Sequence, residues 1–346
     1  ALDLPSGEVL AMVSRPAFNP NDFSAGISRS RWSRLRDHGG FPMTNRAIQN
    51  AFPPGSTFKI AMAAAGLESG VITPETAVTC TGAIRFGNRD FRCWKAGGHG
   101  RVSLHRAIVE SCDVYFYELG RKLGVDRIAK TAKALSLGRQ TGIPLPSERG
   151  GLIPTAEWKE RARGQPWYPG ETLSVAIGQG YVLTTPIQLA TMSSAVGNGG
   201  EWRRPSVVRA VRPHADWTFR SLEETERVAS EVKSETLAFI RESLRGVVHE
   251  PGGTGHAARV EGLDIGGKTG TAQVVSLRER REAREARFRD HAWFVAVAPV
   301  ANPRIAVAVF VEHGGHGGSA AAPVARKVIE AYLARKNDPP APGGAS

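Results

Sequence analysis

The chain is poor in cysteine and lacks a long hydrophobic run. Only three of its 346 residues are cysteine, which excludes a dense disulfide framework. No segment reaches the roughly 18 to 20 uninterrupted apolar residues that a membrane-spanning helix needs. Hydrophobic residues make up 41% and charged residues 23% of the chain. This balance excludes a disordered or collagen-like chain and predicts a globular protein with a core.

Acidic residues are in the minority: 33 Asp and Glu face 45 Lys and Arg, a formal net charge of +12. A basic surface suits nucleic acid, anionic lipid or an acidic polymer. Two basic runs, residues 29–36 and 278–289, hold much of this charge. Neither run has the interleaved aromatics of a single-strand binder. We therefore interpret both as solvated surface and expect no nucleic-acid partner.

Strand-like sequence lies near both ends of the chain, and helical periodicity lies between them. Residues 1–14 read as a hairpin, and residues 293–297 and 305–311 read as a second one. The 305–311 run is continuously apolar, which predicts a strand covered on both faces. A sheet built from about residues 1–50 and 251–337 with a helical insertion at about 56–250 explains this order as one α+β domain, residues 1–337. The Pro/Gly-rich tail 338–346 is predicted to be disordered.

Ser56 and Lys59 lie three positions apart before an apolar helical run. If Ser56 opens that helix, both side chains share one face. A hydroxyl becomes a good nucleophile when a base removes its proton, and burial or a nearby cation favours the neutral amine that can do this. The spacing alone is weak evidence, because Ser230 and Lys233 repeat it in a charged, surface-like stretch.

Two further patterns add to this pair. Ser111 and Asp113 lie in a polar loop between two helical stretches, where an ordinary capping turn is the alternative. Lys268, Thr269, Gly270 and Thr271 read as a strand whose glycine allows a substrate backbone to approach closely. A plain glycine-containing turn is the alternative there.

Taken together and in this order, the three patterns resemble the penicillin-binding proteins and serine β-lactamases. Further stretches resemble the elongation branch of the class B penicillin-binding proteins. Division-type relatives usually carry Asn where this chain has Asp113. The resemblance covers nearly the whole chain and implies a central antiparallel five-stranded sheet flanked by helices, plus an all-helical subdomain. The stretches that carry it are PGSTFK at 54–59, WK at 94–95, GGHG at 97–100, IGQGY at 177–181, TPIQ at 185–188 and KTGTAQ at 268–273.

The resemblance implies a peptidoglycan D,D-transpeptidase that acts through an acyl-serine intermediate and needs no cofactor for its chemistry. Ser56 would attack the carbonyl between the last two D-Ala residues of a stem peptide, and Lys59 would accept its proton. Ser111 and Lys268 would help to protonate the leaving D-Ala, and Asp113 would orient that group. Lys268, Thr269 and Thr271 would bind the substrate carboxylate, with Gly270 between them. β-Lactam antibiotics would stall as esters on Ser56.

The resemblance also implies a longer protein. We expect an N-terminal membrane anchor and a pedestal domain before Ala1, so that residues 1–337 form the periplasmic domain of an inner-membrane protein. The expected partners are stem peptides, the lipid-linked precursor, a membrane glycosyltransferase and elongation-complex proteins. The charged stretch 277–290 is predicted to be a long excursion beside the cleft.

All three cysteines, Cys80, Cys93 and Cys112, fall within 33 residues together with His99. Three thiolates and one imidazole are a recognised ligand set for structural zinc, and relatives of the elongation type hold a metal in this region. We therefore predict a zinc site. A Cys80–Cys93 disulfide and three free thiols are the alternatives. His313 and His316 also have a spacing typical of metal ligands, but no acidic or thiol residue lies nearby in the sequence. We interpret them as part of a loop.

Two other functions are open on the same scaffold. A serine β-lactamase needs a base that activates water, a Glu in the class A type, and the stretch that begins at Glu171 matches that segment poorly. A non-enzymatic β-lactam sensor would keep the acylating serine, and the sequence of the site does not exclude one.

Overall fold

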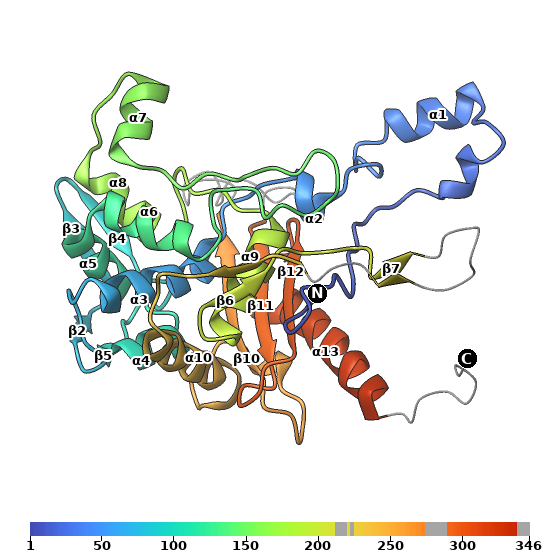
Figure 1. The fold of residues 1–346 in the computed structure, drawn as a ribbon. Helices are drawn as coiled ribbons and strands as arrows, with labels where there is room; N and C mark the ends of the chain where they lie inside the picture. Colours follow the sequence, from blue (N-terminus) through green and yellow to red (C-terminus); the bar gives the residue numbers. More distant parts are fainter. Residues whose placement is uncertain (212–219, 222–224, 274–288, 338–346) are drawn as a thin grey trace.

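A computed structural model describes residues 1–211, 220–221, 225–273 and 289–337. The tail 338–346 and most of the excursion predicted at 277–290 lie outside these residues. The described part mixes helices with a central antiparallel sheet, which confirms the predicted α+β class (Figure 1). None of its helices is long and apolar enough to span a bilayer.

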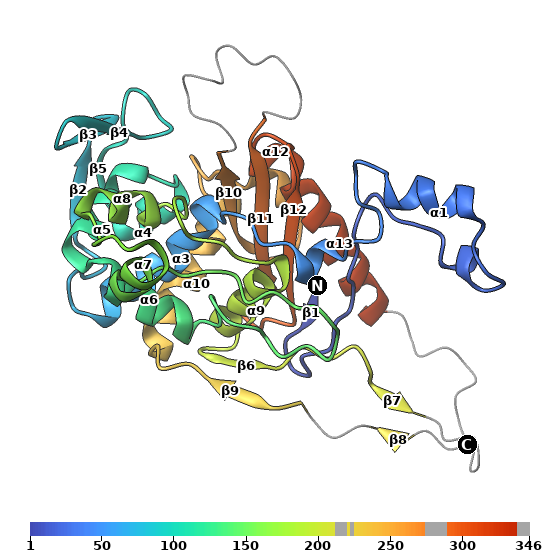
Figure 2. The ribbon, with the colours of Figure 1, turned by 90° about the horizontal axis from the view of Figure 1, so that it is seen from above.

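The central sheet is assembled from the two ends of the chain. Its strands run antiparallel in the order β1-β12-β11-β10. The register places Lys268 of β10 opposite Val295 of β11. β10 is the edge strand next to the helical region, and the short 3-10 helix that carries Ser56 packs against it (Figure 2). The strand bounds are Leu2–Asp3 (β1), Gly266–Ala272 (β10), His291–Ala298 (β11) and Ile305–Val311 (β12).

One predicted strand is missing from this sheet. The resemblance implied five strands, and the described residues contribute four. The second arm of the expected N-terminal hairpin is reduced to a single bridge between Leu2 and Val9. The backbone N–H of Val9 donates to Ser206 instead (2.7 Å), and the N–H of Leu10 donates to Ala1. The N-terminal arm therefore leaves the sheet after one bridge.

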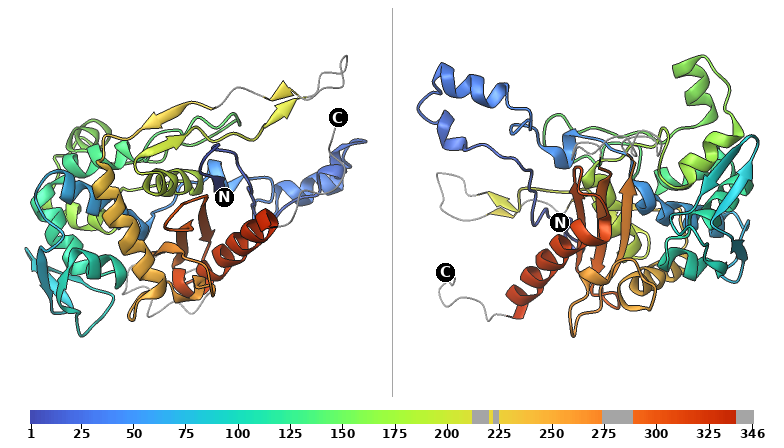
Figure 3. Two further views of the ribbon diagram at one scale, coloured as in Figure 1. Left: turned by 60° about the horizontal axis from the view of Figure 1, so that its bottom comes forward. Right: turned by 180° about the vertical axis from the view of Figure 1, so that it is seen from behind.

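Helices cover both faces of the sheet, as the apolar composition of its strands predicts. Phe294 and Ala296 of β11 pack in one cluster with Ile329 of α13, whereas Trp293 and Val295 belong to the helical core on the other face. Alternate residues of a strand point to opposite faces, so a strand buried on both sides must be apolar throughout. Figure 3 shows the two layers, with α9 and α13 on opposite sides of the sheet. The covering helices are α9 (Pro186–Gly197), α10 (Ser234–His249), α12 (Gly317–Ala320) and α13 (Ala322–Asn337).

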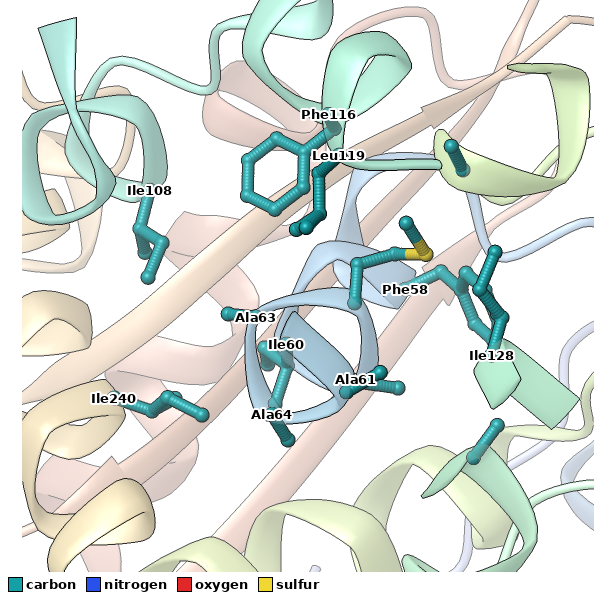
Figure 4. Packing of buried hydrophobic residues seen from close by; sticks show 14 of the residues in the cluster. Phe58, Ile60, Ala61, Ala63, Ala64, Ile108, Phe116, Leu119, Ile128 and Ile240 are labelled. Atoms are coloured by element: carbon teal, nitrogen blue, oxygen red, sulfur yellow. The ribbon is translucent and has the colours of Figure 1, made fainter. Parts of the chain in front are cut away.

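Helix α3 (Lys59–Glu68) is the centre of the inserted region. Eight of its ten residues are buried, and four of them are alanine. Small side chains let neighbouring helices approach on every side, and Figure 4 shows Ile108, Phe116, Ile128 and Ile240 packed around it. The helix that carries the proposed base is therefore held on all sides. Its neighbours include α4 (Leu104–Val109), α5 (Asp113–Leu123), α6 (Val125–Ala134) and α10.

The insertion is not all-helical, which corrects the implied subdomain. Short antiparallel pairs interrupt it, including a lobe between α3 and α4. In this lobe, positive φ angles at Gly82 and Gly87 favour tight turns over helix. The strands are β2 (Ala77–Cys80) with β5 (Gly100–Ser103), β3 (Ala83–Phe86) with β4 (Arg89–Arg92), β6 (Glu201–Arg203) with β9 (Arg227–Ala229), and β7 (Ala210–Val211) with β8 (Arg220–Ser221).

One of the remaining helices is peripheral. Helix α1 (Arg29–Arg36) has no buried residue and projects from the body (Figure 1), so this basic run is solvated surface as predicted. His313 and His316 lie in the loop between β12 and α12. The other elements are α2 (Arg46–Gln49), α7 (Ala156–Arg163), α8 (Pro169–Ala176) and the 3-10 helices η1 (Pro20–Phe23), η2 (Gly55–Phe58) and η3 (His256–Ala258).

Candidate active site

Ser56 lies in the 3-10 helix η2, immediately before α3 begins at Lys59. Ser56 is partly exposed, whereas Lys59 is fully buried. The turn presses against β10: a Cβ on Gly55 would stand 2.4 Å from the carbonyl oxygen of Thr271, and its φ of +55° is left-handed. Only glycine fits this position without strain, so η2 holds Ser56 directly against the strand that carries Lys268.

The ammonium group of Lys59 is fully engaged. Its Nζ donates to the Ser111 carbonyl oxygen (2.9 Å), to Ser111 Oγ (3.2 Å) and to Asp113 Oδ1 (2.6 Å). Three acceptors match the three donors of a protonated lysine. Lys59 therefore forms one half of a buried ion pair with Asp113.

Ser111 is held in an unusual backbone conformation at the α4–α5 junction. Its φ of +55° lies in the left-handed region, which costs a non-glycine residue energy and is found mostly at functional sites. Asp113 is the first residue of α5, where the positive end of the helix favours its carboxylate. The turn thereby directs the side chains of Ser111 and Asp113, which form the second motif, at Lys59.

Lys268 is the second buried lysine of the site. Its Nζ makes one hydrogen bond, to the Thr269 carbonyl oxygen at 3.3 Å, and it is fully buried on β10. Burial first, and then the positive charge of Lys59, hold the pKa of Lys268 well below that of an ordinary lysine, with Asp113 acting in the opposite direction. A lysine in this environment is suited to relaying a proton.

Contacts that sequence reasoning missed position the rest of the third motif, residues 268–271. Thr269 Oγ1 lies 2.8 Å from Thr254 Oγ1, and Gln179 Nε2 donates to the Thr271 carbonyl oxygen at 3.2 Å. A Cβ on Gly270 would lie 2.7 Å from the carbonyl oxygen of Pro54. Thr254 stands in a glycine-rich turn with no periodic signal, so nothing in the sequence pointed to it.

Ser230 and Lys233, which repeat the Ser-x-x-Lys spacing, are not part of this site. The hydroxyl of Ser230 accepts a hydrogen bond from the backbone N–H of Val232, and Lys233 is exposed at the start of α10. The structure thus brings Ser56, Lys59 and the second and third motifs together, and it leaves the repeated Ser-x-x-Lys spacing on the surface.

The predicted metal ligands converge behind the second motif. One ligand atom from each of Cys80, Cys93, His99 and Cys112 lies within 4.8 Å of the others, and all four residues are buried. His99 Nδ1 stands 3.6 Å from Cys80 Sγ and 3.5 Å from Cys93 Sγ. In a tetrahedral zinc site with Zn–S bonds of about 2.3 Å, ligand atoms stand about 3.5 to 3.8 Å apart. The donor set and its spacing therefore fit zinc.

Two further observations agree with this fit. His99 Nε2 has no hydrogen-bond partner and faces Glu110 Oε2 at 3.8 Å, and a carboxylate behind a histidine ligand is a common outer-shell arrangement. The hydrogen bond between the two thiols lowers the pKa of Cys93 to about 5 and raises the pKa of Cys112, so it favours one thiolate of the set. No disulfide links Cys80 to Cys93 or to Cys112, so the disulfide alternative is not what the structure shows.

Comparisons with known proteins agree over most of the chain. Residues 1–330 match the family model of the penicillin binding protein transpeptidase domain. The peptidoglycan D,D-transpeptidase MrdA of Acinetobacter baumannii is 41% identical over 98% of this chain and 51% of its own length. The chain therefore spans about half the length of this curated relative.

Two solved structures have a similar fold. The crystal structure of Pseudomonas aeruginosa PBP2 in complex with WCK 5153 has a TM-score of 0.84 and 40% identity, covering 96% of this chain and 70% of that one. The complex between PBP2 and MreC from Helicobacter pylori has a TM-score of 0.85 and 32% identity, covering 96% and 59%. These matches confirm the resemblance to the elongation-type penicillin-binding proteins.

Proposed function

The chain belongs to the penicillin-binding protein transpeptidase family, and from this premise we propose that it is the catalytic domain of a D,D-transpeptidase that cross-links stem peptides during cell-wall elongation. One observation carries the proposal. The buried Nζ of Lys59 binds both Ser111 and Asp113 one turn from the partly exposed Ser56. This is the nucleophile, base and proton-relay set that acyl transfer needs.

Acylation begins when Ser56 Oγ attacks the carbonyl between the two terminal D-Ala residues. Lys59 accepts the serine proton, for which it must first release one of its own along its hydrogen bonds to Asp113 or Ser111. The backbone N–H groups of Ser56 and Thr271 stabilise the developing oxyanion by about 3 kcal/mol per donor. The close contact between η2 and β10 supports an oxyanion hole between these two residues.

The leaving D-Ala needs a proton and a binding site for its carboxylate. Ser111 Oγ, with Lys268 as the second proton relay, supplies the proton to the departing nitrogen. Thr269 and Thr271 bind the carboxylate from β10, and Gly270 leaves room for the Pro54 carbonyl oxygen where β10 meets η2. An amine of a second stem peptide then attacks the acyl carbon and restores the Ser56 hydroxyl. A β-lactam imitates the D-Ala-D-Ala amide and remains as a stable ester.

The structure gives a reason to prefer this reaction over β-lactamase activity. Both carboxylate oxygens of Glu171 bind Lys159 Nζ, at 2.7 and 2.6 Å, and one also accepts the Tyr168 N–H. A carboxylate bound in this way at the start of α8 does not serve as a free base for water. Persistent penicillin labelling therefore distinguishes this enzyme from a lactamase, and cross-linking of stem peptides distinguishes it from a sensor.

A structural zinc ion held by Cys80, Cys93, His99 and Cys112 completes the proposal. Zinc would supply folding energy and take no part in the acyl transfer. Cys112 stands between Ser111 and Asp113, and the Asp113 N–H lies 3.4 Å from Cys93 Sγ, so the ligand set braces the second motif from behind. Metal analysis of protein purified without added zinc should find about one equivalent. A zinc-free and fully active preparation would refute the site.

For the whole protein we propose a periplasmic, inner-membrane-anchored enzyme. Its partners would be the lipid-linked precursor, a membrane glycosyltransferase and other elongation-complex proteins, and the Helicobacter pylori PBP2–MreC complex supports a partner of this kind. The basic surface, at +12 overall, suits anionic glycan strands and membrane faces.

Mass spectrometry of the penicillin adduct tests the enzymatic proposal. The wild-type chain should gain one penicilloyl group on the peptide that contains Ser56, and Ser56→Ala should gain none. Ser230→Ala is the matched control and should label like the wild type. Labelling of folded Ser56→Ala protein, or no covalent gain in folded wild type, would overturn the assignment.

A further inference from the structure

Trp94 is a large aromatic side chain that is fixed and exposed at the same time. It follows strand β4 and is 59% exposed. Its backbone N–H donates to Asp113 Oδ2 (2.9 Å), and its indole Nε1 donates to the carbonyl oxygens of Glu110 (3.0 Å) and Ser111 (3.1 Å). The core does not require this ring, because most of it lies in water, and yet hydrogen bonds hold it in one orientation.

Two of the three acceptors that bind Trp94 belong to Ser111 and Asp113, the residues that bind Lys59. The Ser111 carbonyl oxygen accepts from both Trp94 Nε1 and Lys59 Nζ, and the two oxygens of Asp113 are divided between the same two residues. Trp94 therefore stands directly beside the second motif. The lobe that carries it, around the β3–β4 pair, lies at the outer edge of the helical region (Figure 2).

In the second step of the proposed reaction, the acceptor amine attacks the acyl-enzyme, and this step determines where the acceptor lies. In the proposed reaction, Ser111 Oγ protonates the departing amine. The incoming amine reverses that path, so it approaches the acyl carbon on the Ser111 side. Its nitrogen bonds to the acyl carbon, the ester bond to Ser56 Oγ breaks, and the amine proton passes through Ser111 to Ser56 Oγ. The rest of the acceptor must then extend over the surface beside Ser111.

We propose that the exposed face of Trp94 is the platform on which the acyl-acceptor stem peptide lies. An indole face packs against amide planes and aliphatic side chains. The two hydrogen bonds of Nε1 have already fixed the ring, so binding loses little further conformational entropy. Exposed Arg92 lies near Trp94 in the chain and attracts the carboxylates of the acceptor, and the edge-to-face contact with His99 at 5.4 Å supports the ring. This inference rests on the proposed function.

Kinetics with two acceptors test the platform. The full chain first receives a donor peptide, and then either D-alanine or a stem peptide with a free side-chain amine. Removing the platform in Trp94→Ala or Trp94→Leu should raise the half-saturating concentration of the stem-peptide acceptor at least fivefold more than that of D-alanine. Trp94→Phe keeps an aromatic face but loses the indole hydrogen bonds, so it should shift this ratio by less than Trp94→Ala does. Trp32→Ala, which removes an exposed ring on α1, should leave both values unchanged.

The ratio of the two acceptors separates the platform from a merely structural role. Any defect in acylation or folding affects both acceptors of one variant equally and cancels in the ratio. Equal shifts for the two acceptors in Trp94→Ala and Trp94→Leu would overturn the inference. A Trp94→Phe ratio as large as that of Trp94→Ala would also overturn it, because the indole N–H would then be the important group. Wild type that takes up no penicillin at Ser56 instead overturns the proposed function, and this inference with it.

Discussion

The buried ion pair between Lys59 and Asp113 makes Asp113→Asn the most informative substitution. The Nζ–Oδ1 distance is 2.6 Å, and the two side chains are 0% and 11% exposed. Removing one charge of a buried pair costs about 3 to 5 kcal/mol. The NH₂ group of an asparagine would face the Trp94 N–H, which is also a donor. Its oxygen can still accept from Lys59, so we expect a loss of about 3 kcal/mol, at the lower end of that range.

This loss converts into a measurable melting temperature. With an unfolding entropy of about 2.1 cal/mol/K per residue, 346 residues give ~0.7 kcal/mol/K, so Asp113→Asn should lower Tm by ~4 °C. Acylation by penicillin should slow by roughly 100-fold or more, since the proton-accepting group is no longer held in place. Differential scanning calorimetry and stopped-flow labelling measure the two effects.

Asp264→Asn is the matched control. Asp264 forms an ion pair of similar length with Arg245 (2.6 Å), but the two side chains are 35% and 43% exposed. Exposed pairs contribute at most about 1 kcal/mol, so the control should melt within ~1 °C of the wild type and acylate normally. Equal Tm shifts in the two variants would refute the reasoning from burial.

Three more predictions follow from the site. Gly178→Ala should slow acylation at least tenfold in the labelling assay, because its Cβ would stand 2.1 Å from the Gly55 carbonyl oxygen at a φ of +71°; labelling at the wild-type rate would contradict the tight contact. The folded protein lowers the pKa of Lys268 below its ordinary 10.5, so Lys268 holds fewer protons in the folded state than in the unfolded state. The free energy of unfolding of the wild type should therefore rise with pH up to 10.5, by up to ~1.4 kcal/mol per pH unit. Urea unfolding at pH 7.5 and 9.5 should show that Lys268→Met lacks this rise, and an equal rise in both proteins would contradict it. His99→Ala should lose the bound zinc and melt lower, whereas His316→Ala should keep both by metal analysis and calorimetry; zinc retained in His99→Ala would remove that ligand from the set.

Much of the fold was predictable because its signals are local. The helical periodicity between the two strand regions predicted an inserted set of helices, and the continuous apolar run at 305–311 predicted β12 between two layers. These patterns reflect burial of one face or of both, which each element shows by itself. The lobe between α3 and α4 was wrongly expected to be helical, because its short strands have only four residues each and little periodicity.

The state of the catalytic lysine was not predictable in the same way. The spacing of Ser56 and Lys59 predicted a shared face, but it carried no information on what Lys59 would meet there. Its partners are 52 and 54 residues further along the chain. Packing of α3 against α5 created the ion pair of Lys59 with Asp113, and burial lowers the pKa of Lys268.

From the sequence alone came the identity and order of the reactive groups: the serine nucleophile, two lysines, a carboxylate, and one histidine with three cysteines in a short stretch. Residue type and helix spacing are sufficient for these inferences, since both are properties of neighbouring residues. Only the tertiary structure decided which groups touch, such as Cys80 with His99, Thr254 with Thr269, and Trp94 with Ser111. The physical reason is that contacts between distant segments depend on how whole helices and strands pack, and no local pattern encodes that geometry.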